Sequence, residues 1–360
     1  MSTTTTMKAA YYHAAKDVRV GETPVPVVNK NQVKIEVKFV GICGTDVHEY
    51  FHGPIMIPLK EPNLLNGHCG PTIMGHEISG VVVEVRDDVC HDNIKAGDRV
   101  VVEPLFRNPS SFYTVNGQYN LSEPVSAIGL TGNGGFAKYV VVEDYMVHKI
   151  PDSVTFEQGA LVEPASVAVY AVQLSNLKPG ETCVIFGAGP IGLLCLQAVL
   201  TVGAARTIVV DIAEKRLDKA RELGATLVIN GIEENISQQI KNYTDNLGVH
   251  VYFDAAGVES TFKAGIASLR RGGRAILIAM FEKPVTLDAM DIVLREITIK
   301  GSPGYRHTFP EVIQLIDSGK MDVERIITKK IKLDDIVKDG FEPLLSDPSE
   351  IKILIDIASS

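Results

Sequence analysis

Four residues of this chain have side chains suited to holding a catalytic metal ion: Cys43, His76, Glu77 and Glu163. A thiolate, an imidazole and carboxylates form the mixture of donors that Zn²⁺ accepts. A catalytic zinc needs three protein ligands and an open position for water or a substrate oxygen. Cys43, His76 and one glutamate meet that number, and the other glutamate would exchange with water or stand behind the direct ligands.

A second group of residues is suited to binding a dinucleotide. Gly187-Ala188-Gly189-Pro190-Ile191-Gly192 follows an apolar strand and opens an apolar helix, which is the context that gives a G-x-G-x-x-G pattern meaning. Gly187 permits the tight turn, Gly189 lets the backbone approach a pyrophosphate, and Gly192 allows the helix to pack closely on the strand. Pro190 and Ile191 complete the turn, and the pyrophosphate would lie at the helix N-terminus.

Asp211 lies at the end of the next predicted strand and selects between the two nicotinamide cofactors. A carboxylate there accepts hydrogen bonds from the ribose hydroxyls and repels a 2′-phosphate, so it favours NAD over NADP. The alternative role for Asp211 is to cap a helix that starts near Ala213. Arg216 would stack on the adenine or, as an alternative, hold a phosphate.

Each group has a simpler explanation when taken alone. Cys43 by itself would be a small buried apolar residue and His76 a hydrogen-bonded core histidine, and a glycine-rich strand–helix turn need not bind a ligand. Together they describe a metal that polarises an oxygen beside a cofactor that accepts a hydride. The combination predicts an alcohol dehydrogenase.

The elements that must position these residues fall into two classes. Residues 8–150 contain many short strands, which predicts a β-rich domain built as a partly closed β-barrel. After Pro151 a helix is expected over Thr155–Leu174, and strands then alternate with helices, which predicts a doubly wound parallel sheet of the Rossmann type. The expected strands are Met7–Tyr12, Val33–Val40, Gly80–Val85, Arg99–Val102, Phe136–Val142, Thr182–Phe186, Thr207–Asp211, Leu227–Ile229, Val251–Ala255, Arg274–Ala279 and Ile297–Lys300. We expect a catalytic domain over 1–162, a dinucleotide-binding domain over 163–303, and a return of 304–360 to the first domain.

Composition excludes several classes of protein. The chain has 360 residues, a net charge of −9 and 45% hydrophobic residues, which argues for a globular fold without a nucleic-acid-binding or anionic-membrane surface. The five cysteines are scattered and odd in number, as expected of free thiols and metal ligands in a reducing compartment. Of these, Cys69, Cys90, Cys183 and Cys195 are expected to be bystanders. With no long apolar run and no secretory leader in the sequence, we expect a cytoplasmic protein.

The chain resembles the zinc-containing medium-chain dehydrogenase/reductase superfamily, and within it the 2,3-butanediol and sorbitol dehydrogenases. The similarity covers nearly the whole chain after Met7. The motifs that carry it are Gly41-Ile42-Cys43-Gly44-Thr45-Asp46, Gly75-His76-Glu77, Gly97-Asp98-Arg99-Val100, Glu163-Pro164 and the Gly187–Gly192 pattern.

The resemblance implies a GroES-like catalytic domain beside a Rossmann domain. It implies zinc at Cys43, His76 and Glu163 with Glu77 close by, and a proton relay through Thr45 and His48. Many members bind a second, structural zinc through four cysteines, but Glu103–Pro124 contains no cysteine here. One catalytic zinc in each subunit is therefore expected.

The resemblance also narrows the substrate. The segment Gly53–Pro71 resembles an insert of the butanediol dehydrogenases, and Gly304 stands where sorbitol dehydrogenases tend to place an arginine. A small vicinal diol or its hydroxyketone, such as (R,R)-2,3-butanediol and acetoin, is therefore expected. Sorbitol or xylitol is the main alternative, and threonine-type or simple secondary alcohols are lesser ones.

Two other functions are also possible for this chain: that of a zinc-free quinone reductase that uses NADPH, and that of a non-enzymatic nucleotide-binding protein. The Cys43, His76 and Glu163 set and the acid at Asp211 argue against both. We expect a homodimer or homotetramer, because Arg274–Met280 and Ile297–Gly301 lie where members of this superfamily pair their Rossmann domains.

Overall fold

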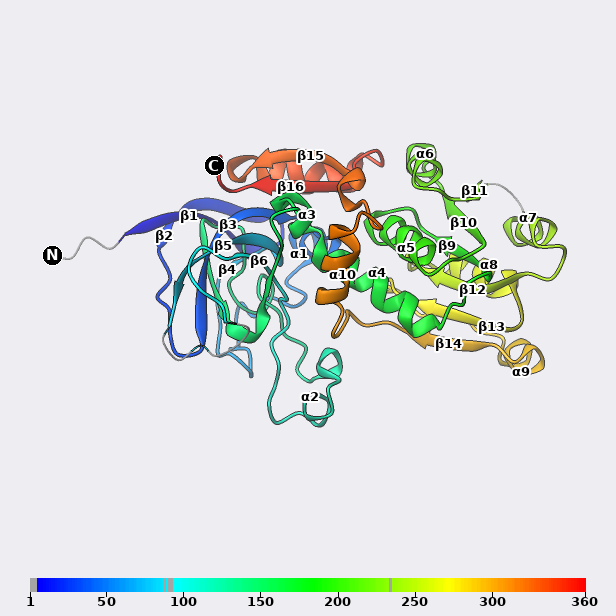
Figure 1. Ribbon diagram of the computed structural model, residues 1–360, viewed down its shortest axis with the longest axis horizontal. Helices are drawn as coiled ribbons and strands as arrows, with labels where there is room; N and C mark the ends of the chain where they lie inside the picture. Colours follow the sequence, from blue (N-terminus) through cyan, green and yellow to red (C-terminus); the bar gives the residue numbers. More distant parts are fainter. Residues whose placement is uncertain (1–4, 87–88, 90–92, 233–234) are drawn as a thin grey trace. The chain divides into compact units, whose positions relative to one another are not determined.

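A computed structural model describes residues 5–86, 89, 93–232 and 235–360 (Figure 1). Cys90 and His91 lie outside the described residues. The chain forms two compact units. Unit 1 comprises Met1–Glu163, Phe309–Asp317 and Ile327–Ser360, and unit 2 comprises Pro164–Thr308 and Ser318–Ile326. The C-terminal part of the chain thus contributes to both units.

Unit 1 is built from short, mostly antiparallel strands, as its sequence predicts. Its described strands are β1 (Thr6–Ala14), β2 (Asp17–Pro24), β3 (Gln32–Gly41), β4 (Thr72–Ile73), β5 (Glu77–Val85), β6 (Arg99–Val102), β7 (Tyr139–Glu143), β8 (Val147–Lys149), β15 (Ile327–Lys332) and β16 (Lys352–Asp356). They form a three-stranded sheet, β2-β1-β4, and a seven-stranded sheet, β15-β16-β3-β5-β6-β8, in which β7 also pairs with β3. Residues of β3 are alternately buried and partly exposed along most of the strand, so one of its faces lies on the core.

The helical segments of unit 1 are short. They are α1 (Gly44–His52), α2 (Phe112–Val115), α3 (Phe156–Ala160), the start of α4 (Val162–Ser175), α10 (Phe309–Asp317), α11 (Glu342–Ser346), the 3₁₀ turns η1 (Tyr119–Leu121), η2 (Asp144–Met146) and η4 (Leu333–Asp335), and the π-helical η5 (Ile336–Phe341). Helix α1 connects β3 to the segment 53–71, and the strand β16 returns beside β3 with Leu354 opposite Gly41. Residues from the C-terminal part of the chain therefore reach the start of α1.

Unit 2 is the expected doubly wound sheet. Its described strands are β9 (Thr182–Phe186), β10 (Arg206–Asp211), β11 (Leu227–Asn230), β12 (Val249–Asp254), β13 (Leu269–Leu277) and β14 (Thr298–Gly301), all parallel, in the order β11-β10-β9-β12-β13-β14. The rest of α4, α5 (Pro190–Thr201), α6 (Glu214–Glu222), α7 (Ile236–Tyr243), α8 (Glu259–Ser268), α9 (Ala289–Arg295) and the 3₁₀ turn η3 (Val323–Ile326) complete the unit. Four of the five residues of β9 are buried, as expected for a central strand covered on both faces.

Several expected elements have other bounds in the structure; β5 begins at Glu77 and β13 at Leu269, each earlier than expected. The helix expected over Thr155–Leu174 is divided into α3 and α4 at Leu161. Pro164 has no backbone N–H to donate back toward α3 and tolerates only the first turn of a new helix. The strand expected over Phe136–Val142 begins at Tyr139, because Phe136 instead bonds across to Met74 and Ala10.

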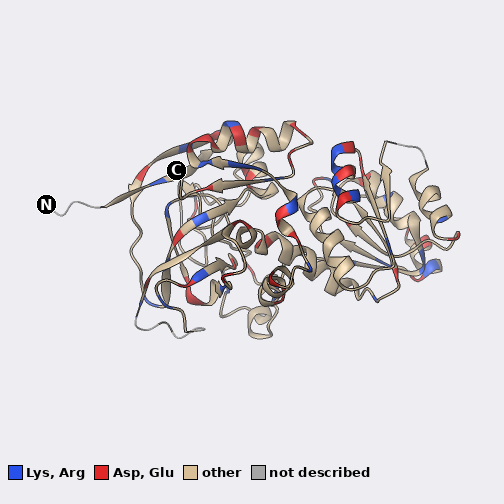
Figure 2. Ribbon diagram, turned by 45° about the horizontal axis from the view of Figure 1, so that its top comes forward, with Lys and Arg blue, Asp and Glu red and all other residues tan. Residues whose placement is uncertain are grey.

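Charged residues of both signs are mixed along the chain, and helix α6 shows the pattern plainly (Figure 2). Among the described residues, no helix combines the length and apolar character that crossing a membrane requires.

Candidate active site

Helix α1 begins at the cysteine expected to bind metal. The Cys43 sulfur caps the helix by accepting from the backbone N–H of Thr45 at 3.5 Å, and the Asp46 carboxylate accepts from the Cys43 N–H at 2.9 Å. This reciprocal arrangement is a capping box. It fixes the thiol at the end of β3 and begins a helix that the sequence analysis did not predict.

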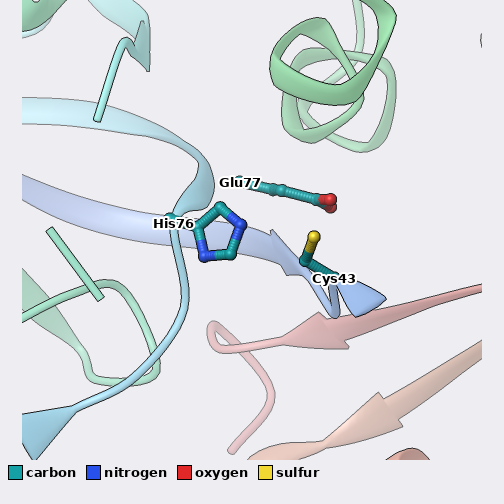
Figure 3. Close-up of side chains that lie close together, drawn as sticks. All are labelled: Cys43, His76 and Glu77. Atoms are coloured by element: carbon teal, nitrogen blue, oxygen red, sulfur yellow. The ribbon is translucent and has the colours of Figure 1, made fainter. Parts of the chain in front are cut away.

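Three of the four expected donors meet in unit 1. The ligand atoms of Cys43, His76 and Glu77 all lie within 4.8 Å of one another. Figure 3 shows the sulfur of Cys43 and the carboxylate of Glu77 facing each other with the His76 ring beside them. The pairing of β3 with β5 produces this approach, because Gly41, near the end of β3, stands opposite Glu77 at the start of β5.

The surroundings of His76 favour a cation. Burial alone would lower the pKa of His76, but Asp46, Cys43 and Glu163 together outweigh it and hold that pKa well above its ordinary value. The Asp46 oxygen Oδ1 lies 3.7 Å from His76 Nδ1, and burial raises the pKa of Asp46 to about 6. A metal ion at this point would supply the positive charge that the buried anionic groups attract, so the residues fit Zn²⁺.

Glu77 is also paired with a buried cation. Lys352 Nζ lies 2.6 Å from Glu77 Oε1 and 2.5 Å from Oε2, and both side chains are almost fully buried. The same ammonium donates to the carbonyl of Ile42 at 2.9 Å. A Cβ at position 41 would lie 1.8 Å from Glu77 Oε2, so the pair can form only because residue 41 is glycine. Lys352 thereby holds the Glu77 carboxylate in place.

The other expected residues of this site lie around the three donors. Glu163 is buried in the first turn of α4 and acts on His76 through its charge, but it is not one of the three donors that meet. Thr45 Oγ1 lies 3.6 Å from the Cys43 sulfur. His48 is exposed on α1, with its ring 6.4 Å from that of His52. The roles of these residues as ligands and relay remain predictions.

Sequence reasoning missed two residues of this site, Asp46 and Lys352. The spacing of Cys43 and Asp46 matches a capping box, so that pattern could have revealed Asp46. Lys352 lies in an apolar strand at the far end of the chain, and no local pattern connects it with Glu77. Among the other described cysteines, Cys183 and Cys195 are buried and free and Cys69 is exposed and free.

Unit 2 contains a pocket of about 470 Å³ at the carboxyl ends of β9, β10 and β12. Its lining includes Gly187, Gly189, Asp211 and Arg216. Gly187 has a φ of +96°, and a Cβ at Gly192 would lie 1.7 Å from the Gly187 carbonyl oxygen. Pro190 is the first residue of α5 and Ile191 follows it, so free backbone N–H groups of the helix N-terminus lie beside this turn.

Asp211 links the strand end to the glycine turn. Its carboxylate accepts hydrogen bonds from the Ala188 N–H at 2.6 Å and the Ala213 N–H at 2.8 Å. Helix α6 has Ala213 as its N-cap, with no side-chain cap bond. Asp211 therefore stands in the pocket beside the glycine turn and does not cap the helix itself.

Comparisons with known proteins agree with this geometry. The family model described as "Alcohol dehydrogenase GroES-like domain" matches residues 29–152, and the one described as "Zinc-binding dehydrogenase" matches residues 190–318. The (R,R)-butanediol dehydrogenase of Bacillus subtilis is 42% identical over 97% of this chain and 99% of its own. The sorbitol dehydrogenase of the same species is 34% identical over 97% of each chain. A crystal structure of 2R,3R-butanediol dehydrogenase from Bacillus subtilis superposes with a TM-score of 0.92 and 41% identity, covering 98% of this chain and 99% of the other.

These comparisons confirm the predicted architecture of a GroES-like part and a Rossmann part and the predicted class of enzyme, an oxidoreductase of the alcohol dehydrogenase type. The chain belongs to the zinc-containing medium-chain dehydrogenase/reductase superfamily, in the part that includes the butanediol and sorbitol dehydrogenases.

Proposed function

We propose that this enzyme interconverts (R,R)-2,3-butanediol and acetoin with NAD and one catalytic zinc in each subunit. The observation that carries the proposal is the meeting of Cys43, His76 and Glu77 in a chain 42% identical to an (R,R)-butanediol dehydrogenase. The position of Gly304 supports a small diol over a polyol. Gly304 has a φ of +56°, a conformation that favours glycine and would strain the arginine that a polyol enzyme is expected to place there.

In the proposed mechanism, each residue of the site in unit 1 has a separate role. Cys43, His76 and a glutamate would hold Zn²⁺, with Glu77 and Glu163 as the candidates for the third position. Zinc supplies a Lewis acid that polarises the substrate hydroxyl, and NAD supplies the hydride acceptor. Thr45 Oγ1 would receive the hydroxyl proton, and the exposed His48 would release it to solvent. Asp46 would orient His76 by facing its Nδ1 nitrogen.

The choice of NAD rests on Asp211. Its carboxylate lines the pocket beside the glycine turn, where a 2′-phosphate would meet a negative charge. Arg216 lines the same pocket and would stack on the adenine. We also propose that the protein is a homo-oligomer. A reducing, cytoplasmic compartment is proposed as well, and the free thiols of Cys43, Cys69, Cys183 and Cys195 support it.

The test is the production of NADH by the purified protein with (R,R)-2,3-butanediol, meso-2,3-butanediol or sorbitol, each with NAD⁺ or NADP⁺. We expect the highest kcat/KM with the (R,R) isomer and NAD⁺, one zinc per subunit by elemental analysis, and loss of activity in chelator that returns with Zn²⁺. A preference for sorbitol would make the protein a polyol dehydrogenase. Full activity after verified zinc removal would contradict the zinc-dependent mechanism.

A further inference from the structure

The turn that follows β12 forms one wall of the pocket in unit 2. Strand β12 lies between β9 and β13 and ends at Asp254 (Figure 1). Ala255 and Ala256, which come next, line the pocket. The Ala255 N–H donates to the carbonyl of Phe186 at 2.8 Å, and a Cβ at Gly187 would lie 2.9 Å from the Ala255 carbonyl oxygen. The turn therefore packs directly against the first glycine of the dinucleotide pattern.

One buried carboxylate fixes the course of this turn. Asp254 is fully buried, and its Oδ1 accepts hydrogen bonds from the backbone N–H groups of Ala256 at 2.9 Å and Gly257 at 2.8 Å. The Asp254 carbonyl oxygen accepts from the N–H groups of Ile278 at 2.9 Å and Ala279 at 3.0 Å, just after β13. Hydrogen bonds to an ionised acceptor are about twice as strong as neutral ones. Asp254 thus joins the ends of two strands and holds the backbone of the turn.

The other carboxylate oxygen of Asp254 faces two hydroxyl groups. Tyr252 donates its hydroxyl hydrogen to Oδ2, and Thr261 Oγ1 lies 3.3 Å from the same atom. Burial and the nearby Asp254 charge raise the pKa of Tyr252, so its hydroxyl stays protonated and remains a donor. A Cβ at residue 265 would collide with the Tyr252 ring, so this arrangement requires Gly265. Thr261 itself lines the pocket, so the cluster also reaches the pocket from α8.

We propose that Asp254 is a positioning residue for the cofactor: by holding the backbone of residues 255–257, it shapes the wall of the pocket against which the adenosine end of the dinucleotide binds. This inference rests on the proposed use of NAD. Asp211 and Arg216 line the same pocket, and the proposed function assigns them to the ribose and the adenine. A surface that is already held in its bound shape loses less free energy when the ligand binds, so the cluster around Asp254 should determine cofactor affinity.

The cluster and the metal donors belong to different units. Asp254, Tyr252 and Thr261 lie in unit 2, whereas Cys43 and His76 lie in unit 1. A change at Asp254 should therefore weaken binding of the cofactor while zinc binding and the chemical step persist.

The test measures binding of NADH, by its fluorescence, and of ADP-ribose, which lacks the nicotinamide, to the wild-type enzyme and to Asp254→Asn. Asparagine has the shape of aspartate but replaces one acceptor oxygen with a donor nitrogen, so one set of partners loses its acceptor. We expect Kd for both ligands and KM for NAD⁺ to rise about tenfold. At saturating NAD⁺, kcat should fall by no more than about twofold, with KM for butanediol and zinc content unchanged.

Tyr252→Phe tests the same cluster without changing the carboxylate. It removes one donor from Oδ2, so Kd for ADP-ribose should rise in this variant as well, by a smaller factor. The double variant should bind ADP-ribose no more weakly than Asp254→Asn, because both changes act on one hydrogen-bonded cluster. The matched control is Tyr243→Phe, which removes a hydroxyl elsewhere in unit 2 that donates to the Thr226 carbonyl at 3.4 Å and should bind like the wild type.

A merely structural role for Asp254 predicts a lower free energy of unfolding with an unchanged Kd for ADP-ribose in the folded variant, and that result would overturn the proposal. Equal weakening in Tyr243→Phe would overturn it as well. If Asp254→Asn does not fold, an unchanged Kd in Tyr252→Phe overturns it. A wild-type enzyme that binds neither NADH nor ADP-ribose would instead contradict the proposed function, so the two failures are distinguishable.

Discussion

At the scale of single residues, the site depends on charges that are buried together. Lys352 and Glu77 are each 1% exposed. Lys352 Nζ lies 2.5 Å from Glu77 Oε2, and this ion pair is shielded from water. Two buried opposite charges add little stability compared with apolar residues, but one left alone is strongly destabilising. The pair is therefore best explained as a way of holding the Glu77 carboxylate beside Cys43 and His76.

Replacing Lys352 by methionine should lower the free energy of unfolding of the zinc-free protein by about 3–5 kcal/mol, because it removes the cation paired directly with the buried Glu77 carboxylate. Denaturant unfolding in the presence of chelator measures this loss. Lys34→Met is the control, since Lys34 pairs at 2.6 Å with Glu84, whose side chain is 50% exposed, and should cost at most about 1 kcal/mol. Adding Glu77→Gln to Lys352→Met should recover much of the stability, and no recovery would contradict the explanation.

At the scale of elements, a cluster of polar and aromatic side chains holds the segment 103–124 against the rest of unit 1. The Arg107 guanidinium lies 4.2 Å from the ring centre of Tyr119 and 4.7 Å from that of Tyr145, and it donates to Glu103 at 3.2 Å. His148 Nε2 lies 2.9 Å from the same Glu103 oxygen. Cation–π and charge-assisted contacts of this kind fix a segment without a metal ion. They show how a stretch without cysteines is held to unit 1.

The contribution of this cluster to the free energy of unfolding should depend on pH. Burial alone would raise the pKa of Glu103, but hydrogen bonds from His148 and Tyr119 and the charges of His148 and Arg107 outweigh it and lower that pKa below its ordinary 4.5. Because the pKa of Glu103 is lower in the folded protein than in the unfolded one, ionised Glu103 stabilises the fold above pH 4.5. This stabilisation is lost as the pH falls through the folded-state pKa.

Glu103→Gln should therefore destabilise the protein by about 1–3 kcal/mol near pH 7, and the difference from wild type should shrink as the pH falls below 4.5. Urea unfolding at several pH values measures this difference. Glu84→Gln, at an exposed ion pair, should show little effect. A difference that stays constant down to the acid limit would contradict the assignment.

At the scale of the whole molecule, one edge of unit 2 is suited to association. Strand β14 is the edge of the parallel sheet and pairs with β13 on its other side. Helix α9, which precedes it, exposes Met290 at 64%, Val293 at 73% and Leu294 at 64%. A sheet edge with exposed apolar side chains nearby is a surface that another chain would cover.

We expect the double change Val293→Asp and Leu294→Asp to shift the protein toward the monomer, because two charges would be buried in the proposed contact. Sedimentation velocity at several protein concentrations measures the shift. Leu64→Asp, at a 90% exposed position of unit 1, is the control and should leave the assembly unchanged. A double variant that sediments like the wild type would exclude this edge as the interface.

The sequence by itself determined the features that depend on neighbours along the chain. The Gly187–Gly192 turn, the strand Thr182–Phe186 and the alternating strand Val33–Val40 are local patterns, because backbone geometry and side-chain periodicity act over a few residues. The types of Cys43, His76 and the two glutamates made them candidate ligands, and the resemblance of their motifs to a known superfamily added the proton relay and the substrate class.

Only the tertiary structure decided the contacts between distant residues. Lys352 reaches Glu77 because β16 lies beside β3, and β3 in turn pairs with β5. The buried Glu49 carboxylate likewise lies where Gly53 and Tyr12 come together across the fold. A buried charge is stable only where a complete set of partners surrounds it. Those partners come from separate elements, so their meeting is a property of strand order and packing that no local stretch of sequence contains.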